Sequence, residues 1–427
     1  MQRALSLLLF ALPAGVGIAA QSHLDFRRDA LAAYDRKDYP AARDAFAAAL
    51  KLRPDSPRYL HSLAAMSAMS GDKAAAFRLL EQLADLGVAT AIERDPNLAS
   101  LQAEPEFLRI LRRFAENRSA QGEAEVVAEM PGRTGIIEGI AFRPRTADIF
   151  LGDVHLRGIW RRDRTGQITR FSAEDEELLG IFGLAIDEAR NTLWAAMSAL
   201  PEMSDFAADL KGQAGLAEFN LSTGDLRRVI PVPSDGRDHV LADLLVAENG
   251  IVYATDSLAP VIWQLSPGDE EMVKLAESKQ FMSLQGLVIV QRMLIVSDYN
   301  NGLFAVDLKA GEHGRSADEA IRAFTPPPNA TLLGIDGLVA VPGGIAAVQN
   351  GVTPQRIIRI VLSPDLQSIT AVEVLASAVT HLEDLSLVTL MNDRPTFIAG
   401  AGWEGFDPAK SARPAAHAVR IMQVALP

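Results

Sequence analysis

The stretch GIDGLVAVPGGIAAVQNG, residues 334–351, contains two short apolar runs separated by Pro342, Gly343 and Gly344. Both runs are rich in Val, Ile, Leu and Ala, and the Pro-Gly-Gly between them marks a tight turn. The stretch therefore predicts two adjacent antiparallel strands. The first strand begins with a polar residue, Asp336, followed by Gly and aliphatic residues, and this pattern recurs elsewhere in the chain.

The pattern occurs six times between residues 138 and 387. The copies are EGIAF (138–142), FGLAI (182–186), ADLLV (242–246), QGLVI (285–289), DGLVA (336–340) and EDLSL (383–387). They begin 43 to 60 residues apart, a spacing typical of four-stranded propeller blades. The sequence therefore predicts that residues 121–427 form an all-β, six-bladed propeller around a central channel.

Residues 21–120 have a different sequence pattern, in which apolar residues recur at helical spacing and Pro and Gly interrupt the runs. This pattern predicts a set of helices. Similar residues lie 34 positions apart, such as Ala30 and Ala64 or Asp38 and Asp72. This segment resembles the tetratricopeptide repeat, which implies stacked helix pairs that can dock a protein partner. The alternative is that the helices only brace the second domain.

Composition excludes several classes of function. The chain has 427 residues, a formal net charge of −13 and no cysteine. An acidic chain repels nucleic-acid phosphates, so we expect no nucleic-acid partner. Without cysteine there are no disulfides, thiolate metal sites or cysteine nucleophiles, so any site chemistry depends on oxygen and nitrogen groups.

The first 20 residues, MQRALSLLLFALPAGVGIAA, have an early Arg, a short apolar run and then small residues. This order predicts a secretory signal peptide cleaved after Ala19 or Ala20. We therefore expect a periplasmic or secreted protein with no membrane span after signal cleavage. The alternative is an uncleaved anchor, although the apolar run is short for a spanning helix.

The first residues of the six patterns should form a ring at one mouth of the channel, because equivalent innermost strands surround the axis. They include three carboxylates, Glu138, Asp336 and Glu383, and one amide, Gln285. Carboxylates gathered in this way repel unless protons or a cation neutralise them. Oxygen donors favour calcium over zinc, with magnesium or manganese as alternatives, and we predict these four residues as ligands. The alternative is that they only begin strands and bind nothing.

Other polar residues suggest simpler roles. Asp153, Asp256 and Asp298 follow second strands, where we expect their side chains to bond the turn backbone. His239 and His381 precede two of the patterns and could shuttle protons, although surface positions are the simpler interpretation.

The segments IIEGIAF (136–142) and GIDGLVAVPGGIAAVQNG (334–351) are similar to the regucalcin and gluconolactonase (SMP-30) family of six-bladed propellers, and more distantly to paraoxonases. This resemblance implies a central metal that supports lactone hydrolysis. It also implies that Glu138 and Asp336 are ligands and that Asp336 is the catalytic general base. The chain departs from the family at Ala242 and Gln285, where the family has asparagines, and it lacks the arginine expected before the third pattern.

Two hypotheses follow from these observations. The first is an exported, divalent-metal-dependent hydrolase of the lactonase type, acting on a lactone or related small ester. The alternative is a non-catalytic exported protein that binds partners through the helical repeats and the propeller loops.

Overall fold

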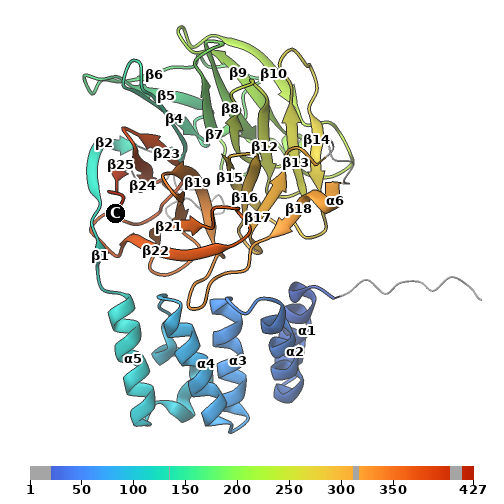
Figure 1. The fold of residues 1–427 in the computed structure, drawn as a ribbon, viewed down its shortest axis with the longest axis vertical. Helices are drawn as coiled ribbons and strands as arrows, with labels where there is room; N and C mark the ends of the chain where they lie inside the picture. Colours follow the sequence, from blue (N-terminus) through green and yellow to red (C-terminus); the bar gives the residue numbers. More distant parts are fainter. Residues whose placement is uncertain (1–20, 134, 311–316, 404–415) are drawn as a thin grey trace, which may run out of the picture.

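The computed structural model describes residues 21–133, 135–310, 317–403 and 416–427. It consists of a layer of helices packed against a ring of β-sheets (Figure 1). The predicted signal peptide, residues 1–20, lies outside the described residues. Within the described ranges, no helix has the length and apolar character needed to cross a membrane.

The helical layer is built from helices that lie side by side. They are α1 (His23–Asp35), α2 (Tyr39–Leu52), α3 (Pro57–Met69), α4 (Lys73–Asp85) and α5 (Pro105–Asn117), with the 3-10 turns η1 (Ile92–Arg94) and η2 (Pro96–Leu101) before α5. The side chains of Ser22, Asp38, Ser56 and Asp72 each accept a first-turn backbone N–H and so begin α1 to α4. The two serines lie 34 residues apart, as do the two aspartates, so both helix pairs start in the same way. The tetratricopeptide assignment remains an interpretation.

The strands form six sheets, numbered here as blades 1 to 6. Blade 1 contains β3 (Ile137–Arg143), β4 (Asp148–Asp153), β5 (Gly158–Arg162) and β6 (Ile168–Arg170). Blade 2 contains β7 (Gly180–Asp187), β8 (Thr192–Ser198), β9 (Ala214–Asn220) and β10 (Leu226–Pro231), with the turn η3 (Ala208–Leu210) before β9. Blade 3 contains β11 (Leu241–Val246), β12 (Val252–Asp256), β13 (Val261–Leu265) and β14 (Val273–Glu277).

The remaining blades complete the ring. Blade 4 contains β15 (Leu284–Val290), β16 (Met293–Asp298), β17 (Gly302–Asp307) and β18 (Ile321–Ala323), with the short helix α6 (Ala317–Ala320) before β18. Blade 5 contains β19 (Ile335–Val341), β20 (Gly344–Gln349), β21 (Arg356–Leu362) and β22 (Ile369–Ser377), with β1 (Gln121–Gly122) at its edge. Blade 6 contains β23 (Val388–Met391), β24 (Arg394–Ala399), β25 (His417–Gln423) and β2 (Glu125–Arg133). The predicted fold, helices followed by a six-bladed all-β propeller, is confirmed.

The ring is closed by strands from the two ends of the propeller sequence. In blade 6, β2 pairs antiparallel with β25, so that Glu125 lies opposite Gln423. Three strands of this blade therefore come from the end of the chain, and the outermost strand comes from the beginning of the propeller. This pairing holds the two ends of the propeller sequence in one sheet and so keeps the ring closed.

In blades 1 to 5 the recurring pattern starts the innermost strand, and the pairing register with the second strand shifts there. Glycines in this bulge allow close approach of neighbouring blades. A Cβ at Gly139 would overlap the Phe182 carbonyl oxygen, and one at Gly286 would lie 2.3 Å from the Asp336 oxygen. The inner strands thus pack backbone against backbone around the axis.

Side-chain hydroxyls join each of four blades to the next. The donors and the accepting carbonyls are Ser198 to Leu241, Thr255 to Gln285, Ser297 to Asp336 and Ser386 to Glu138. The acceptors are residues at the starts of the innermost strands. These bonds satisfy carbonyl groups that the bulges leave out of the ladder, and they hold the channel mouth in place.

Blade 6 departs from the prediction because its innermost strand starts at Val388, after the pattern EDLSL. Val388 takes the pairing position that Leu338 has in blade 5. Ser386, two residues earlier, therefore corresponds to Asp336, and Glu383 stands further back in the preceding turn. Sequence similarity alone therefore aligned Glu383 with Asp336, whereas the strand pairing aligns Ser386 with it.

The helical layer packs on the end of the propeller where the innermost strands begin, at blades 4 and 5 (Figure 1). The Nε2 atom of His23 is 2.8 Å from the Asn301 amide oxygen in the loop after β16. The buried Asp55 carboxylate accepts the backbone N–H of Leu332, which precedes β19. Val352, from the loop after β20, belongs to the hydrophobic core of the helices.

Close approach of the inner strands gives a stability prediction. In the Gly286→Ala variant the new Cβ lies 2.3 Å from the Asp336 carbonyl oxygen, and we expect the free energy of unfolding to fall by about 3 kcal/mol. The matched control is Gly268→Ala between β13 and β14, where a Cβ meets nothing within 4 Å but φ is +89°. Its expected cost is about 1 kcal/mol. Denaturant unfolding followed by tryptophan fluorescence measures both, and equal losses would contradict the packing argument.

Candidate functional site

A cavity of about 370 Å³ lies at the channel mouth, where the innermost strands begin. Its walls include three of the four predicted ligands, Glu138, Gln285 and Asp336. The other lining residues are Phe182, Leu200, Val240, Ala242, Ser257, Tyr299, Asn350, Gln355, Asp384, Leu385 and Trp403. Residues nearly 200 positions apart are thus brought to one place by the ring of strands.

Glu138 begins β3 and is buried, with 7% of its surface exposed. Its Oε2 atom accepts a hydrogen bond from the indole Nε1 of Trp403. Burial raises the pKa of Glu138 to about 8, and the nearby charge of Asp336 acts in the same direction. In the absence of a positive group the carboxyl therefore holds its proton at neutral pH.

Asp336 begins β19 and is also buried. Its Oδ2 atom accepts a hydrogen bond of 2.7 Å from the amide of Asn350, whose own oxygen accepts one of 3.0 Å from the Tyr299 hydroxyl. Burial raises the pKa of Asp336 to about 6, while the bond from Asn350 favours the charged form. Asp336 is therefore charged at neutral pH and basic enough to accept a proton.

The other predicted positions differ in what they offer. Gln285 donates its amide N–H to the Ser283 hydroxyl at 3.1 Å, which orients the side chain. Ala242 lines the same cavity with a methyl group and supplies no donor atom. Glu383 is exposed and does not line the cavity, because its turn precedes β23. Asp384, the next residue, lines it instead and helps to raise the pKa of Glu138.

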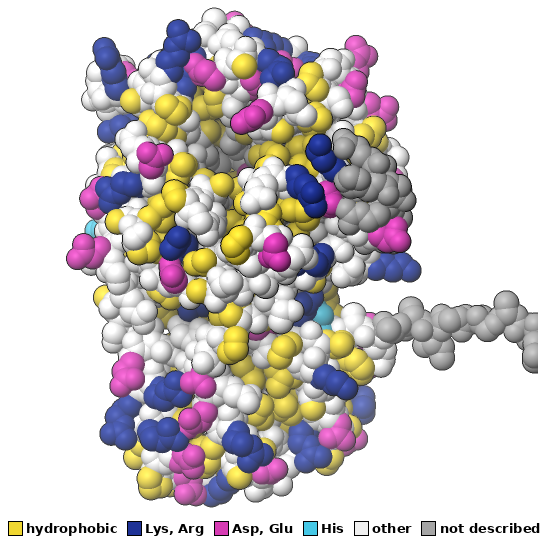
Figure 2. Space-filling view, in the orientation of Figure 1, with side chains coloured by type: hydrophobic (Ala, Val, Ile, Leu, Met, Phe, Trp, Pro, Cys, Tyr) yellow, Lys and Arg dark blue, Asp and Glu magenta, His cyan; other side chains and the backbone are white. Residues whose placement is uncertain are grey.

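Asp243 is an acidic residue of the channel that the sequence analysis did not single out. It is half-buried in β11 and lines a second cavity of about 1220 Å³, which follows the channel away from the mouth. Enclosure by protein raises the pKa of Asp243 to about 8, and Asp336 adds to the shift. The available signal was its place in the pattern, where four other copies have glycine. Figure 2 shows hydrophobic side chains around a hollow near the middle of the propeller.

The donor set fits a hard divalent cation only in part. Two buried carboxyls with raised pKa values face a cavity whose described lining contains no Lys, Arg or His, and Gln285 adds an amide, which is the chemistry that calcium accepts. Among the described residues, however, no three Asp, Glu, His or Cys side chains are grouped closely enough to hold a metal ion. Any cation here would depend on Glu138, Asp336 and amide oxygen.

The second-strand aspartates stabilise turns, as predicted. Asp153, Asp256 and Asp298 are fully buried, and each accepts backbone N–H groups from the loops beside it. His239 is buried between carboxylates, with Nδ1 at 2.6 Å from Asp256, and does not line the cavity. His381 is exposed.

Comparison with solved structures gives similar folds at low identity. A PQQ-bound aldose sugar dehydrogenase from Streptomyces coelicolor is 14% identical, with a TM-score of 0.47 over 72% of this chain and 99% of that chain. A gluconolactonase from Xanthomonas campestris is 12% identical, with a TM-score of 0.46 over 69% and 88%. Virginiamycin B lyase from Staphylococcus aureus is 11% identical, with a TM-score of 0.43 over 71% and 100%.

No family model matches the sequence, and no curated protein matches it. These structural similarities concern the fold alone. The function of this chain must therefore be argued from its own site.

The raised pKa of Glu138 predicts a pH-dependent stability. In buffer with chelator, the folded state keeps this proton between pH 4.5 and about 8, whereas the unfolded chain releases it near pH 4.5. The folded state binds more protons in this window, so its stability falls as pH rises. We compare the free energies of unfolding of Glu138→Gln and the wild type. From pH 5 to pH 8.5, we expect the difference to shift by at least about 1 kcal/mol in favour of the variant.

Urea unfolding at the two pH values measures this gain. The exposed Glu270→Gln is the control, because it removes the same charge without a buried carboxyl. A difference between wild type and Glu138→Gln that does not change with pH would show that Glu138 titrates normally.

Proposed function

We propose that this chain is an exported hydrolase of small lactones or related esters that uses a divalent cation, preferentially calcium, at the channel mouth. The observation that carries the proposal is the pair Glu138 and Asp336, two buried carboxyls with raised pKa values facing one cavity of about 370 Å³. This volume is in the range of small-molecule sites. Support for export comes from the sequence of residues 1–20 alone.

Asp336 acts in this proposal as the general base. Its pKa of about 6 leaves it charged at neutral pH, and Asn350 and Tyr299 hold its carboxylate in one orientation. As a water molecule attacks the carbonyl carbon of the ester, the carboxylate takes its proton. When the ring C–O bond breaks, Asp336 returns the proton to the leaving oxygen, and a hydroxy acid is released.

Glu138, Asp336 and the Gln285 amide would hold the cation, which when bound polarises the substrate carbonyl and stabilises charge on its oxygen. Glu138 gives up its proton on binding, so affinity rises with pH. The apolar wall formed by Phe182, Leu200 and Leu385 excludes water from around the ester.

The proposal predicts a large effect at Asp336. With calcium present, we expect Asp336→Asn to lower kcat for small lactones by about a hundredfold or more, because an amide accepts no proton. Because bound calcium favours the charged form of Asp336, the rise of wild-type kcat with pH should lie below the pKa of about 6 that this carboxyl has without a cation. The exposed Asp393→Asn, which removes the same charge far from the cavity, should keep full activity.

Chelator should abolish lactone turnover, and calcium should restore it. Turnover that survives both chelator and Asp336→Asn would overturn the proposed mechanism.

Ala242 favours a second candidate, a non-catalytic exported protein that binds ligands or partners through its propeller loops and helices. The methyl group leaves one side of the cavity without a donor atom. Calcium binding measured by calorimetry together with no turnover over a panel of lactones would favour this candidate over the hydrolase.

A further inference from the structure

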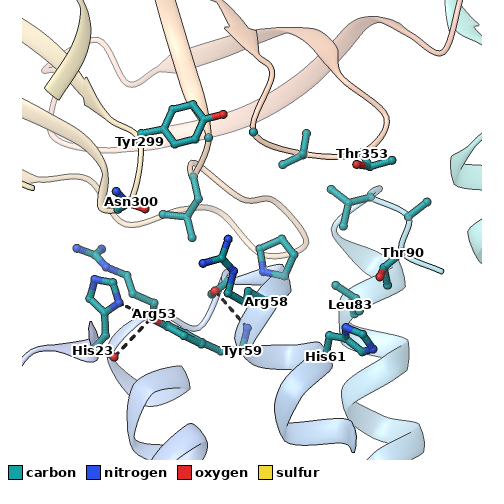
Figure 3. A pocket seen from close by; sticks show the side chains of 18 of the residues that line it. His23, Arg53, Arg58, Tyr59, His61, Leu83, Thr90, Tyr299, Asn300 and Thr353 are labelled. Carbon is teal, nitrogen blue, oxygen red and sulfur yellow. Dashed lines mark hydrogen bonds between the residues drawn. The ribbon is translucent and has the colours of Figure 1, made fainter. Parts of the chain in front are cut away.

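A separate cavity of about 440 Å³ lies between the helical layer and the propeller, and we call it the interlayer cavity. Its lower wall includes Arg53, residues 56–59, His61 and the start of α1, and its upper wall includes Tyr299, Asn300 and residues 351–353. Figure 3 shows Arg53 and Arg58 on the helical side and Tyr299 and Asn300 on the opposite side. Neither layer alone would enclose this space.

The charge of the interlayer cavity is opposite to that of the whole protein. Among the described residues that line it are two arginines, Arg53 and Arg58, and two histidines, but no Asp or Glu. The chain as a whole has a net charge of −13. Figure 2 shows a histidine and basic side chains where the helices meet the propeller. A cavity of this kind concentrates anions.

Arg53 is the unusual member of this group. Its side chain is half-buried, and burial lowers its pKa from the usual value. Within the described part of the chain, neither a hydrogen bond nor an ion pair joins its guanidinium to another side chain. The nearby acids have other partners, since Asp55 accepts the Leu332 N–H and Asp298 accepts backbone N–H groups from its own loops. The charges of Asp55 and Asp298 favour the cation, but its N–H donors have no side-chain acceptor among the described residues and can bind a ligand.

The surroundings fix the rest of the cavity. The His23 ring is fixed by two hydrogen bonds, one between Nδ1 and the Tyr59 hydroxyl at 2.7 Å and one between Nε2 and the Asn301 amide oxygen at 2.8 Å. Burial lowers the pKa of His23, which favours the neutral ring. Arg58 is exposed at the rim, in the first turn of α3, where the helix dipole also favours an anion. Apolar side chains such as Leu83, and the Tyr299 ring, complete the lining.

We propose that the interlayer cavity binds the oxyanion group, carboxylate or phosphate, of a small organic molecule through Arg53 and Arg58. Guanidinium groups match both oxyanions with paired hydrogen bonds. The apolar lining accommodates the body of the ligand, and about 440 Å³ suits a compact molecule. This site is distinct from the channel mouth, although Tyr299 lines both cavities.

Calorimetry with the full chain tests this site with three probes of similar shape. Benzoate and phenyl phosphate carry the two oxyanions, and benzamide is the uncharged control. We expect at least one anion to bind in a one-to-one ratio and benzamide to bind at least tenfold more weakly. Binding of benzoate alone identifies a carboxylate site, and binding of phenyl phosphate alone identifies a phosphate site. No binding of either anion, or equal binding of benzamide, would overturn the proposal.

Variants locate the binding. We expect Arg53→Gln and Arg58→Gln each to weaken anion binding tenfold or more, because each removes a charge-assisted contact. Arg78→Gln removes the same charge from an exposed position of α4 outside the cavity and should bind as the wild type does. Asp336→Asn changes the channel mouth and should bind the anion as the wild type does. The anion site can therefore be tested whether or not the hydrolase proposal holds. Equal binding by all four variants, or loss only in Asp336→Asn, would overturn the assignment.

Stability separates a ligand contact from a structural role for Arg53. Without ligand, we expect the melting temperature of Arg53→Gln to stay close to that of the wild type, because no described side chain bonds the guanidinium and the charges of Asp55 and Asp298 act on it without an ion pair. Addition of the anion that binds should raise the melting temperature of the wild type but not that of Arg53→Gln. A variant that melts lower without ligand and gains as much with it would show that Arg53 only supports the fold.

Discussion

The whole structure depends on how closely six inner strands approach one another around a single axis. Glycines such as Gly139 and Gly286 remove the side chains that would hold neighbouring blades apart. Hydroxyl groups from the second strands and from Ser386 then bond the carbonyls that the bulges leave exposed. The same crowding that closes the ring also forces the first residues of the strands into one small cavity.

That crowding explains the electrostatics of the site. Glu138 and Asp336 begin strands in blades 1 and 5, yet the charge of Asp336 raises the pKa of Glu138 because both carboxyls are buried at the same cavity. Asp243 adds a third acid deeper in the channel. Holding these groups charged is unfavourable for folding, so the arrangement favours a role in which protons or a cation exchange there.

Much of this arrangement could be predicted from the sequence because strand starts repeat at the spacing of blades. That periodicity placed Glu138, Gln285 and Asp336 at one mouth, and the structure brings them to one cavity. The periodicity placed Glu383 wrongly. The innermost strand of blade 6 has only four residues and starts after the EDLSL pattern, so the sequence pattern does not show its register. It could not show the interlayer cavity, which exists only where helices and distant loops meet. The pairing of His23 with Asn301, 278 positions away, has no local signal.

The pairing of β2 with β25 also sets an order of events during synthesis. The five helices of the helical layer end by residue 117 and β2 ends at residue 133, whereas β25 spans residues 417–423 and is made after every other strand that the structure describes. Until then the nascent blades present two unsatisfied strand edges, those of β2 and β24. Once β25 is made, it can pair with the β2 strand of a second chain instead of its own, so the pairing that closes one ring also gives a route to intertwined dimers.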